Sequence, residues 1–221
     1  MRLAIIQARM SSSRLPGKVL KPVKNMTMLE YELERVKQSV EIDKIVVATS
    51  DDASDNIIEE ILSRKYIDVY RGSLNNVLER FYKCSLNYNP DHVIRITADC
   101  PLIDPKIIDA VIKLHLESDA DYTSNVLPRT FPDGLDIEVM KFSTLEKVYN
   151  CAREQDEIEH VTKYIHKYPN KFKISNLKYH TDLSNVRWTL DTLEDYEKLK
   201  QIIESFENNT FCLEDIITKF K

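Results

Sequence analysis

Short apolar runs alternate with amphipathic segments through the first half of the chain, and this alternation is what most constrains the fold. The apolar runs cover residues 3–7, 44–49, 67–70 and 92–97. Residues 28–40, 53–64 and 75–88, and a segment opening at Asp104-Pro105, carry apolar side chains at helical spacing. Strands covered on both faces have such continuous apolar runs, and strand–helix alternation is typical of parallel sheets. We therefore predict a three-layer α/β/α fold with a mostly parallel, Rossmann-like sheet.

The pattern changes from about residue 133. We expect strands at residues 136–140, 171–176 and 185–190, and helices at residues 144–152, 157–168, 194–206 and 213–220. The sequence contains no linker, repeat or low-complexity stretch. We therefore predict a single domain over residues 1–221, with an inserted subregion at about 133–180 for a second ligand or for dimerisation.

The composition excludes several classes of protein. The net charge of −5 argues against a general nucleic-acid binder. No apolar run approaches the roughly 18 residues that span a bilayer, and the N-terminus lacks a signal-peptide core, so we expect no membrane association and a cytoplasmic location. Four scattered cysteines predict reduced thiols. The three glycines, Gly17, Gly72 and Gly134, cannot form a dinucleotide or Walker phosphate loop.

The most informative segment, residues 7–18, reads QARMSSSRLPGK and directly follows the first expected strand. It holds three cations, Arg9, Arg14 and Lys18, with three consecutive serines between the first two. Guanidinium and ammonium groups with hydroxyl and amide donors suit phosphate oxygens, and ligands of such sheets gather at the strands' carboxyl ends. A lone arginine here would indicate only a solvated basic loop. The whole cluster favours binding of a polyphosphate.

Two aspartates are candidates for a metal site. Asp99 follows the strand at 92–97, and Asp191 follows the expected strand at 185–190. Two carboxylates at one sheet edge can hold Mg²⁺, which screens a polyphosphate and stabilises the charge that develops during its cleavage. As alternatives, Asp99 could cap the turn before Pro101, and Asp191 could cap the following helix, where Thr192 and Asp195 also make a capping pair.

The stretch IIQARMSSSRLPGKVL resembles the signature of the spore coat polysaccharide cytidylyltransferase-like family. It is more loosely similar to the CMP-Kdo and CMP-sialic acid synthetases. This resemblance implies a nucleotide-diphospho-sugar transferase (glycosyltransferase-A-like) fold, with the loop's cations on the triphosphate of CTP. CMP-Kdo synthetases have a G-D-E-P segment where this chain has Ala98-Asp99-Cys100-Pro101, so the aspartate is kept and the neighbouring acid is replaced.

The residues carried over from the resemblance fall into four groups. The implied catalytic residues are Arg9, Arg14, Lys18 and Asp99. The implied nucleotide ligands are Ala8, Arg9, Ser11, Ser12, Ser13, Arg14, Lys18, Asp51, Ser73, Arg80 and Asp99. The implied acceptor ligands are Asp136, Glu138, Glu159 and His160, and the implied metal ligands are Asp99 and Asp191. Ordinary acidic turns and exposed strand edges would equally explain Asp51, Asp136 and Glu138.

The resemblance implies an enzyme that transfers CMP from CTP to an acidic sugar, Kdo-like or nonulosonate-like, and releases pyrophosphate. It further implies Mg²⁺ as the cofactor, a homodimer, and a role in surface polysaccharide biosynthesis. One alternative is a glycosyltransferase, since Asp119-Ala120-Asp121 matches the letters of a D-x-D metal motif. Another is a non-catalytic nucleotide-binding protein, for which loss of the metal carboxylates would be expected.

Overall fold

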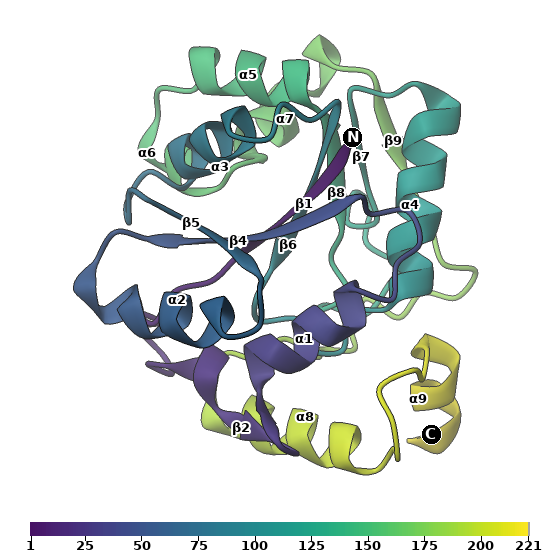
Figure 1. The fold of residues 1–221 in the computed structure, drawn as a ribbon. Coiled ribbons are helices and arrows are strands. Elements are labelled where there is room, and N and C mark those ends of the chain that lie inside the picture. Colours follow the sequence, from purple (N-terminus) through teal and green to yellow (C-terminus); the bar gives the residue numbers. More distant parts are fainter. Residues whose placement is uncertain (221) are drawn as a thin grey trace.

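A computed structural model describes residues 1–220, and its central feature is a seven-stranded sheet (Figure 1). The strand order is β5-β4-β1-β6-β8-β7-β9. The strands are β1 (Arg2–Gln7), β4 (Lys44–Ser50), β5 (Asp68–Gly72), β6 (His92–Thr97), β7 (Tyr122–Ser124), β8 (Glu138–Lys141) and β9 (Ile174–Asn176). Only β8 is antiparallel to both of its neighbours within this sheet, which confirms the mostly parallel arrangement. A separate ribbon pairs β2 (Pro22–Val23) with β3 (Met26–Thr27).

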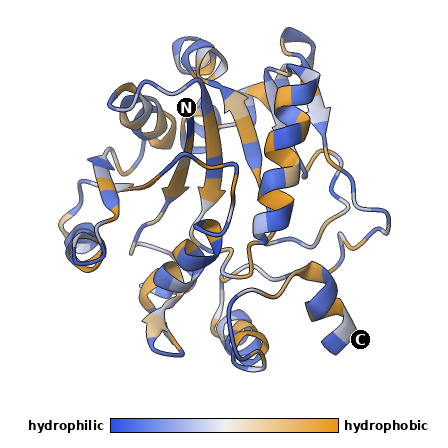
Figure 2. Ribbon diagram, turned by 45° about the vertical axis from the view of Figure 1, so that its right-hand side comes forward, coloured by the Kyte–Doolittle hydropathy of each residue, from blue (hydrophilic) through white to orange (hydrophobic). Residues whose placement is uncertain are grey.

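Helices cover both faces of the sheet and so make the three predicted layers (Figure 1). One face carries α3 (Val77–Leu86), α5 (Phe142–Cys151), α6 (Gln155–Glu159) and α7 (Lys163–Lys167). The other carries α1 (Met28–Val36), α2 (Asn56–Ser63), α4 (Pro105–Ser118), α8 (Leu193–Glu204) and α9 (Leu213–Lys219). These outer helices combine hydrophobic and hydrophilic residues, as amphipathic helices on a covered sheet should (Figure 2). None of the described helices is long and apolar enough to cross a membrane.

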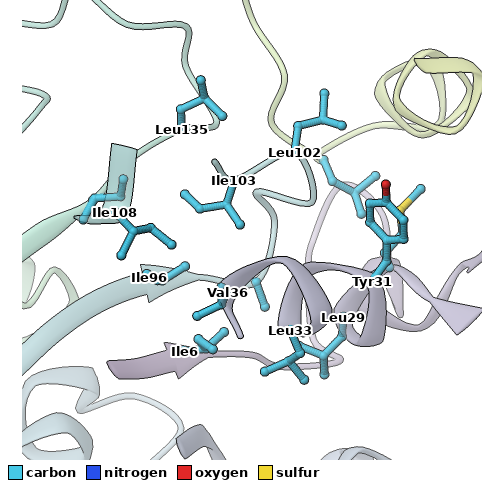
Figure 3. Close-up of a cluster of buried hydrophobic side chains, with 14 of the residues drawn as sticks. Ile6, Leu29, Tyr31, Leu33, Val36, Ile96, Leu102, Ile103, Ile108 and Leu135 are labelled. Atoms are coloured by element: carbon cyan, nitrogen blue, oxygen red, sulfur yellow. The ribbon is translucent and has the colours of Figure 1, made fainter. Parts of the chain in front are cut away.

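The first strand shows why both faces must be covered. Leu3 and Ile5 pack into the cluster under α3 and α5, whereas Ala4 and Ile6 pack into the cluster under α1 and α4. All four are completely buried. Figure 3 shows Ile6 close to α1, near the side chain of Val36. Burying each large aliphatic side chain contributes roughly 1.5–3 kcal/mol, so the apolar run is stable only as a central strand.

The strand register brings the ends of three strands to one edge of the sheet. Gln7, the last residue of β1, pairs with Ala48 of β4 and with Thr97 of β6. These pairings are parallel, so the loops that follow β1, β4 and β6 all leave from this edge. The sequence segments predicted to bind phosphate and metal therefore start side by side.

Three predicted elements differ from the structure. The helix predicted at 157–168 is two short helices, α6 and α7, because His160 has extended backbone angles (φ −110°, ψ 95°). The strand predicted at 185–190 is absent: this segment bonds to Asp133 at one point and to Asp99 at another, so no continuous ladder forms. The short strand β7 was not predicted. The first long helix ends at Val36 rather than at residue 40.

Candidate active site

A cleft of about 320 Å³ opens at the edge where the loops after β1 and β6 meet. Its lining residues are Gln7, Ala8, Arg9, Ser12, Ser13, Arg14, Lys18, Val19, Arg80, Thr97, Ala98, Asp99, His160 and Asp191. The structure thus gathers most of the predicted nucleotide residues and both predicted metal ligands in one place. Gln7, Val19, Thr97 and Ala98 were not predicted as site residues.

The loop after β1 is anchored from below by Asp55, at the end of the short 3₁₀ helix η2 (Ala53–Asp55). The amide of Met10 donates to Asp55 Oδ1 over 2.7 Å. Asp55 is fully buried and also accepts from the Thr49 hydroxyl (2.9 Å) and the Ser50 amide (3.0 Å). At the far end the loop closes through Gly17, whose amide donates to Met10 O and whose φ of +69° suits glycine. Asp55 was not predicted as a site residue, because the sequence Asp-Asp-x-x-Asp after a strand looks like an ordinary acidic turn.

Lys18 lies between the two predicted metal ligands. Its Nζ is 2.9 Å from Asp99 Oδ2 and 2.9 Å from Asp191 Oδ1. The lysine begins the 3₁₀ helix η1 (Lys18–Leu20), Asp99 follows β6, and Asp191 precedes α8. A backbone bond from Leu190 N to Asp99 O (2.8 Å) holds the two aspartates in register. Two carboxylates from distant parts of the chain therefore converge on one cationic group.

Electrostatics keep Lys18 and Asp99 charged. Burial lowers the pKa of Lys18, but the adjacent Asp99 and Asp191 outweigh burial and raise it overall. Burial likewise opposes ionisation of Asp99, and Lys18 outweighs it, so the pKa of Asp99 lies below its ordinary value. The donor set fits a hard cation, because Mg²⁺ is bound through one or two carboxylates together with substrate phosphates. Asp99 and Asp191 are the residues here that could hold one.

Asp191 is also surrounded by arginines. Arg14 Nη2 is 2.9 Å from Asp191 Oδ2, and Arg187 Nη2 contacts the same carboxylate. Arg187 is fixed in turn by Asp195, which lies 2.9 Å from its Nη1. The helix cap is made by Thr192 and Asp195, so the carboxylate of Asp191 is not needed for capping. Arg187 was not predicted as a site residue, because in the extended strand expected at 185–190 it would not reach Asp191, four residues on.

Arg80, from α3, supplies a buried cation to the opposite wall of the cleft. It is 1% exposed, and its Nη1 donates to the carbonyl of Ser73. Its Nε has no hydrogen-bond partner, and no carboxylate of residues 1–220 lies within ion-pair distance. Burial, together with the neighbouring Arg9, lowers the pKa of Arg80 to about 10. A buried guanidinium without a counter-ion is costly, so this wall is suited to an anion.

The predicted acceptor residues are not all brought to the cleft. His160 lines it, because the break between α6 and α7 turns this residue out of the helix. Glu159 is exposed outside the lining. Asp136 is paired with Arg129, whose Nη2 is 2.7 Å from it. The last of the four, Glu138, is buried and bound by Arg95 and by the hydroxyl of Tyr122.

Three predicted nucleotide residues, Ser11, Asp51 and Ser73, also lie outside the lining. The possible D-x-D motif lies elsewhere as well. Asp119 and Asp121 precede the start of β7, which lies at the opposite edge of the sheet, and both are close to Lys141 (2.7 and 3.8 Å). This placement does not support the glycosyltransferase alternative.

Comparison with solved structures places the fold. The structure of a cytidylyltransferase from Leptospira borgpetersenii superimposes with a TM-score of 0.95 at 39% identity, covering 99% of this chain and 92% of that one. The structure of CMP:2-keto-3-deoxy-manno-octonic acid synthetase complexed with CTP superimposes with a TM-score of 0.68, at 15% identity, over 92% of this chain and 98% of that one. The second similarity is one of fold alone.

Sequence comparison defines the family. The spore coat polysaccharide biosynthesis protein SpsF of Bacillus subtilis is 36% identical over 209 residues, which are 91% of this chain and 86% of that protein. The 3-deoxy-manno-octulosonate cytidylyltransferase of Solibacter usitatus is 30% identical over 135 residues, 61% of this chain and about half (52%) of that enzyme. The family model described as "Cytidylyltransferase" matches residues 3–216. The chain therefore belongs to the cytidylyltransferase family, which confirms the resemblance carried by the stretch IIQARMSSSRLPGKVL.

Proposed function

We propose that this protein transfers CMP from CTP to a hydroxyl group of an acidic sugar and releases pyrophosphate. The observation that carries the proposal is the convergence of Asp99 and Asp191 on Lys18 within a cleft walled by arginines. Membership of the family supports nucleotidyl transfer. CTP and an acidic sugar acceptor are supported by the relatives that are named 3-deoxy-manno-octulosonate cytidylyltransferases.

The cleft's own residues can bind the nucleotide in a defined orientation. Lys18 and Arg14 border the carboxylate pair, and Arg9 and Arg80 lie on the other wall, so a triphosphate between them meets cations on both sides. The acceptor oxygen would attack the α-phosphorus in line while the bond to the β-phosphate breaks. The arginines and Lys18 then stabilise the negative charge that gathers on the leaving pyrophosphate.

We further propose Mg²⁺ as the cofactor, with Asp99 and Asp191 as its protein ligands. When bound, the ion supplies positive charge that neutralises the polyphosphate. Arg187 and Asp195 orient Asp191, and the backbone bond from Leu190 orients the segment that carries Asp99. Held in this way, neither carboxylate needs to reorganise before the nucleotide binds.

The acceptor side is proposed to include His160, which lines the cleft. Asp136 and Glu138 would contribute indirectly, because Asp136 pairs with Arg129 and Glu138 pairs with Arg95. We expect a cytoplasmic homodimer that serves surface polysaccharide biosynthesis, as the name of the SpsF relative suggests. The mass in solution, measured by light scattering, checks the dimer.

A pyrophosphate-release assay tests the reaction. Each of the four nucleoside triphosphates is combined with a panel of sugar acids, with and without Mg²⁺. We expect Mg²⁺-dependent release with CTP only. Asp99→Asn should abolish release, because an amide is a weak ligand for a hard cation and no longer pairs with Lys18. Asp52→Asn is the matched control, since Asp52 is an exposed carboxylate outside the cleft and its loss should leave the rate unchanged.

Two results would contradict the proposal. Activity of Asp99→Asn equal to the wild type would remove the metal assignment. Tight CTP binding by calorimetry, without pyrophosphate release across the whole acceptor panel, would favour the non-catalytic nucleotide-binding alternative.

A further inference from the structure

Lys18 already holds the position between the two carboxylates that a metal ion would need. Its ammonium is 2.9 Å from an oxygen of each, and the side chain is only 11% exposed. A divalent ion that binds both Asp99 and Asp191 must therefore displace this ammonium from at least one of them. The contact is more than a weak surface pair, because all three side chains are largely withdrawn from solvent.

The local charge works against a free metal ion as well. Two carboxylates, Asp99 and Asp191, are contacted by three cations, Lys18, Arg14 and Arg187. Both carboxylates are thus already paired with cations, so an approaching dication gains less than it would at an unpaired carboxylate pair. Without the nucleotide, a metal ion must compete with these cations for the carboxylate oxygens.

A polyphosphate could open the site by drawing away two of the three cations. Arg14 is 61% exposed, so its side chain is free to turn toward phosphate oxygens. Lys18 lines the same cleft. Arg187 differs, because Asp195 holds it at 2.9 Å and a second carboxylate, Asp133, lies 3.6 Å away. The nucleotide would thus free the metal-facing oxygens while leaving Asp191 oriented.

We propose that Lys18 is a built-in competitor of the metal ion, which makes metal binding conditional on the nucleotide. The inference rests on the proposed function in that Asp99 and Asp191 are taken as metal ligands. Its consequence is strong positive coupling: the nucleotide raises the affinity for metal, and the metal must raise the affinity for the nucleotide by the same factor. Free metal ions are correspondingly excluded from the resting protein.

The experiment measures Mn²⁺ binding to the nucleotide-free protein by electron paramagnetic resonance. We expect Lys18→Met to bind Mn²⁺ about tenfold more tightly than the wild type, because the competing ammonium is gone. Lys18→Arg retains the charge and should show little gain. Lys21→Met is the matched control: it removes a nearby lysine whose ammonium lies over the ring of Tyr196 (4.8 Å) rather than on the carboxylates.

A second series adds a non-hydrolysable CTP analogue. The factor by which the analogue tightens Mn²⁺ binding should be smaller in Lys18→Met than in the wild type. Chelation of Mn²⁺ by the analogue itself is common to both proteins and cancels in the comparison. A double variant, Lys18→Met with Asp191→Asn, should lose the gain in the nucleotide-free state, which places the bound ion at the carboxylates.

Equal Mn²⁺ affinity of wild type and Lys18→Met, with both proteins folded by circular dichroism, would overturn the competitor role. So would an equal gain in Lys21→Met, since that would show a general charge effect. The first series involves neither CTP nor turnover. A failure to release pyrophosphate from any nucleotide would therefore refute the proposed function while leaving this result to stand on its own.

Discussion

Asp55 is the buried carboxylate on which the geometry of the phosphate loop depends, and its replacement gives a sharp test. In Asp55→Ala two backbone amides, of Met10 and Ser50, lose their acceptor. The hydroxyls of Thr49 and Ser50 lose one as well, but they can rotate toward other partners. Each buried donor left unsatisfied costs about 1–3 kcal/mol, so the two amides together cost about 4 kcal/mol.

That loss is measurable by thermal unfolding. For a chain of this size, 1 kcal/mol lowers Tm by about 2–4 °C, so Asp55→Ala should unfold about 8–16 °C below the wild type. Asp52→Ala is the control from the same turn. Asp52 is exposed, and its carboxylate accepts from the amide and hydroxyl of Ser54, so its loss should cost about 1 kcal/mol.

Asp55→Asn separates stability from the position of the loop. The asparagine oxygen can face the three donors of Thr49 and Ser50, which leaves its NH₂ group against the amide of Met10. Donor then opposes donor, and the anchor of the loop is lost. We expect CTP binding, measured by calorimetry, to weaken about tenfold, with a smaller loss of Tm than in Asp55→Ala. The reasoning fails if Asp55→Ala is no less stable than Asp52→Ala, or if Asp55→Asn binds CTP as the wild type does.

Two further predictions concern stability. His115 is buried against His92 and Thr123, and burial lowers its pKa to about 4, below the roughly 6.5 of an unfolded chain. The unfolded state then binds the proton first, so up to about 3 kcal/mol of stability should be lost as pH falls from about 6.5 to about 4. In His115→Gln, the free energy of unfolding measured with denaturant should depend less on pH across this range. The same dependence on pH as in the wild type would contradict the assignment. Gly134→Ala should cost about 3 kcal/mol, because φ is +108° and the new Cβ would lie 2.6 Å from the backbone of Trp188. Gly72→Ala meets only side-chain atoms at 3.0 Å or more and should lower Tm less, so equal Tm losses in the two variants would count against the backbone clash.

The sequence predicts most of the sheet because its central strands are buried on both faces. Residues 3–6 of β1 are fully buried, and a continuous apolar run is the direct signature of that environment. The prediction fails where local pattern and tertiary contacts disagree. Val161 and Ile165 have helical spacing and are both buried, yet the chain breaks between α6 and α7 at His160. Residues 185–190 look like a strand, but their backbone partners belong to two different segments.

The residues of the cleft also divide into those that the sequence predicts and those that it does not. Arg9, Arg14, Lys18 and Asp99 were predictable because they lie in the loops that directly follow β1 and β6. In a parallel sheet, the loops that follow neighbouring strands lie side by side, so the strand assignments alone place these residues together. The role of Asp55 was not predictable, because it acts through the distant Met10 amide. Arg187 was missed for another reason: in the extended strand expected at 185–190, residues four apart such as Arg187 and Asp191 would not meet. Both side chains make these contacts only in the folded chain.

The contact between Lys18 and Asp191 joins residues 173 positions apart. On the ribosome, the loop after β1 and Asp99 emerge well before Asp191 does, and proteins of this kind are made at about 5–20 residues per second. A nascent chain can therefore form the loop after β1 while Lys18 has only one of its two carboxylate partners. The second carboxylate arrives after residue 191 has left the exit tunnel, so the contact of Lys18 with both aspartates marks a late step in the maturation of the newly made protein.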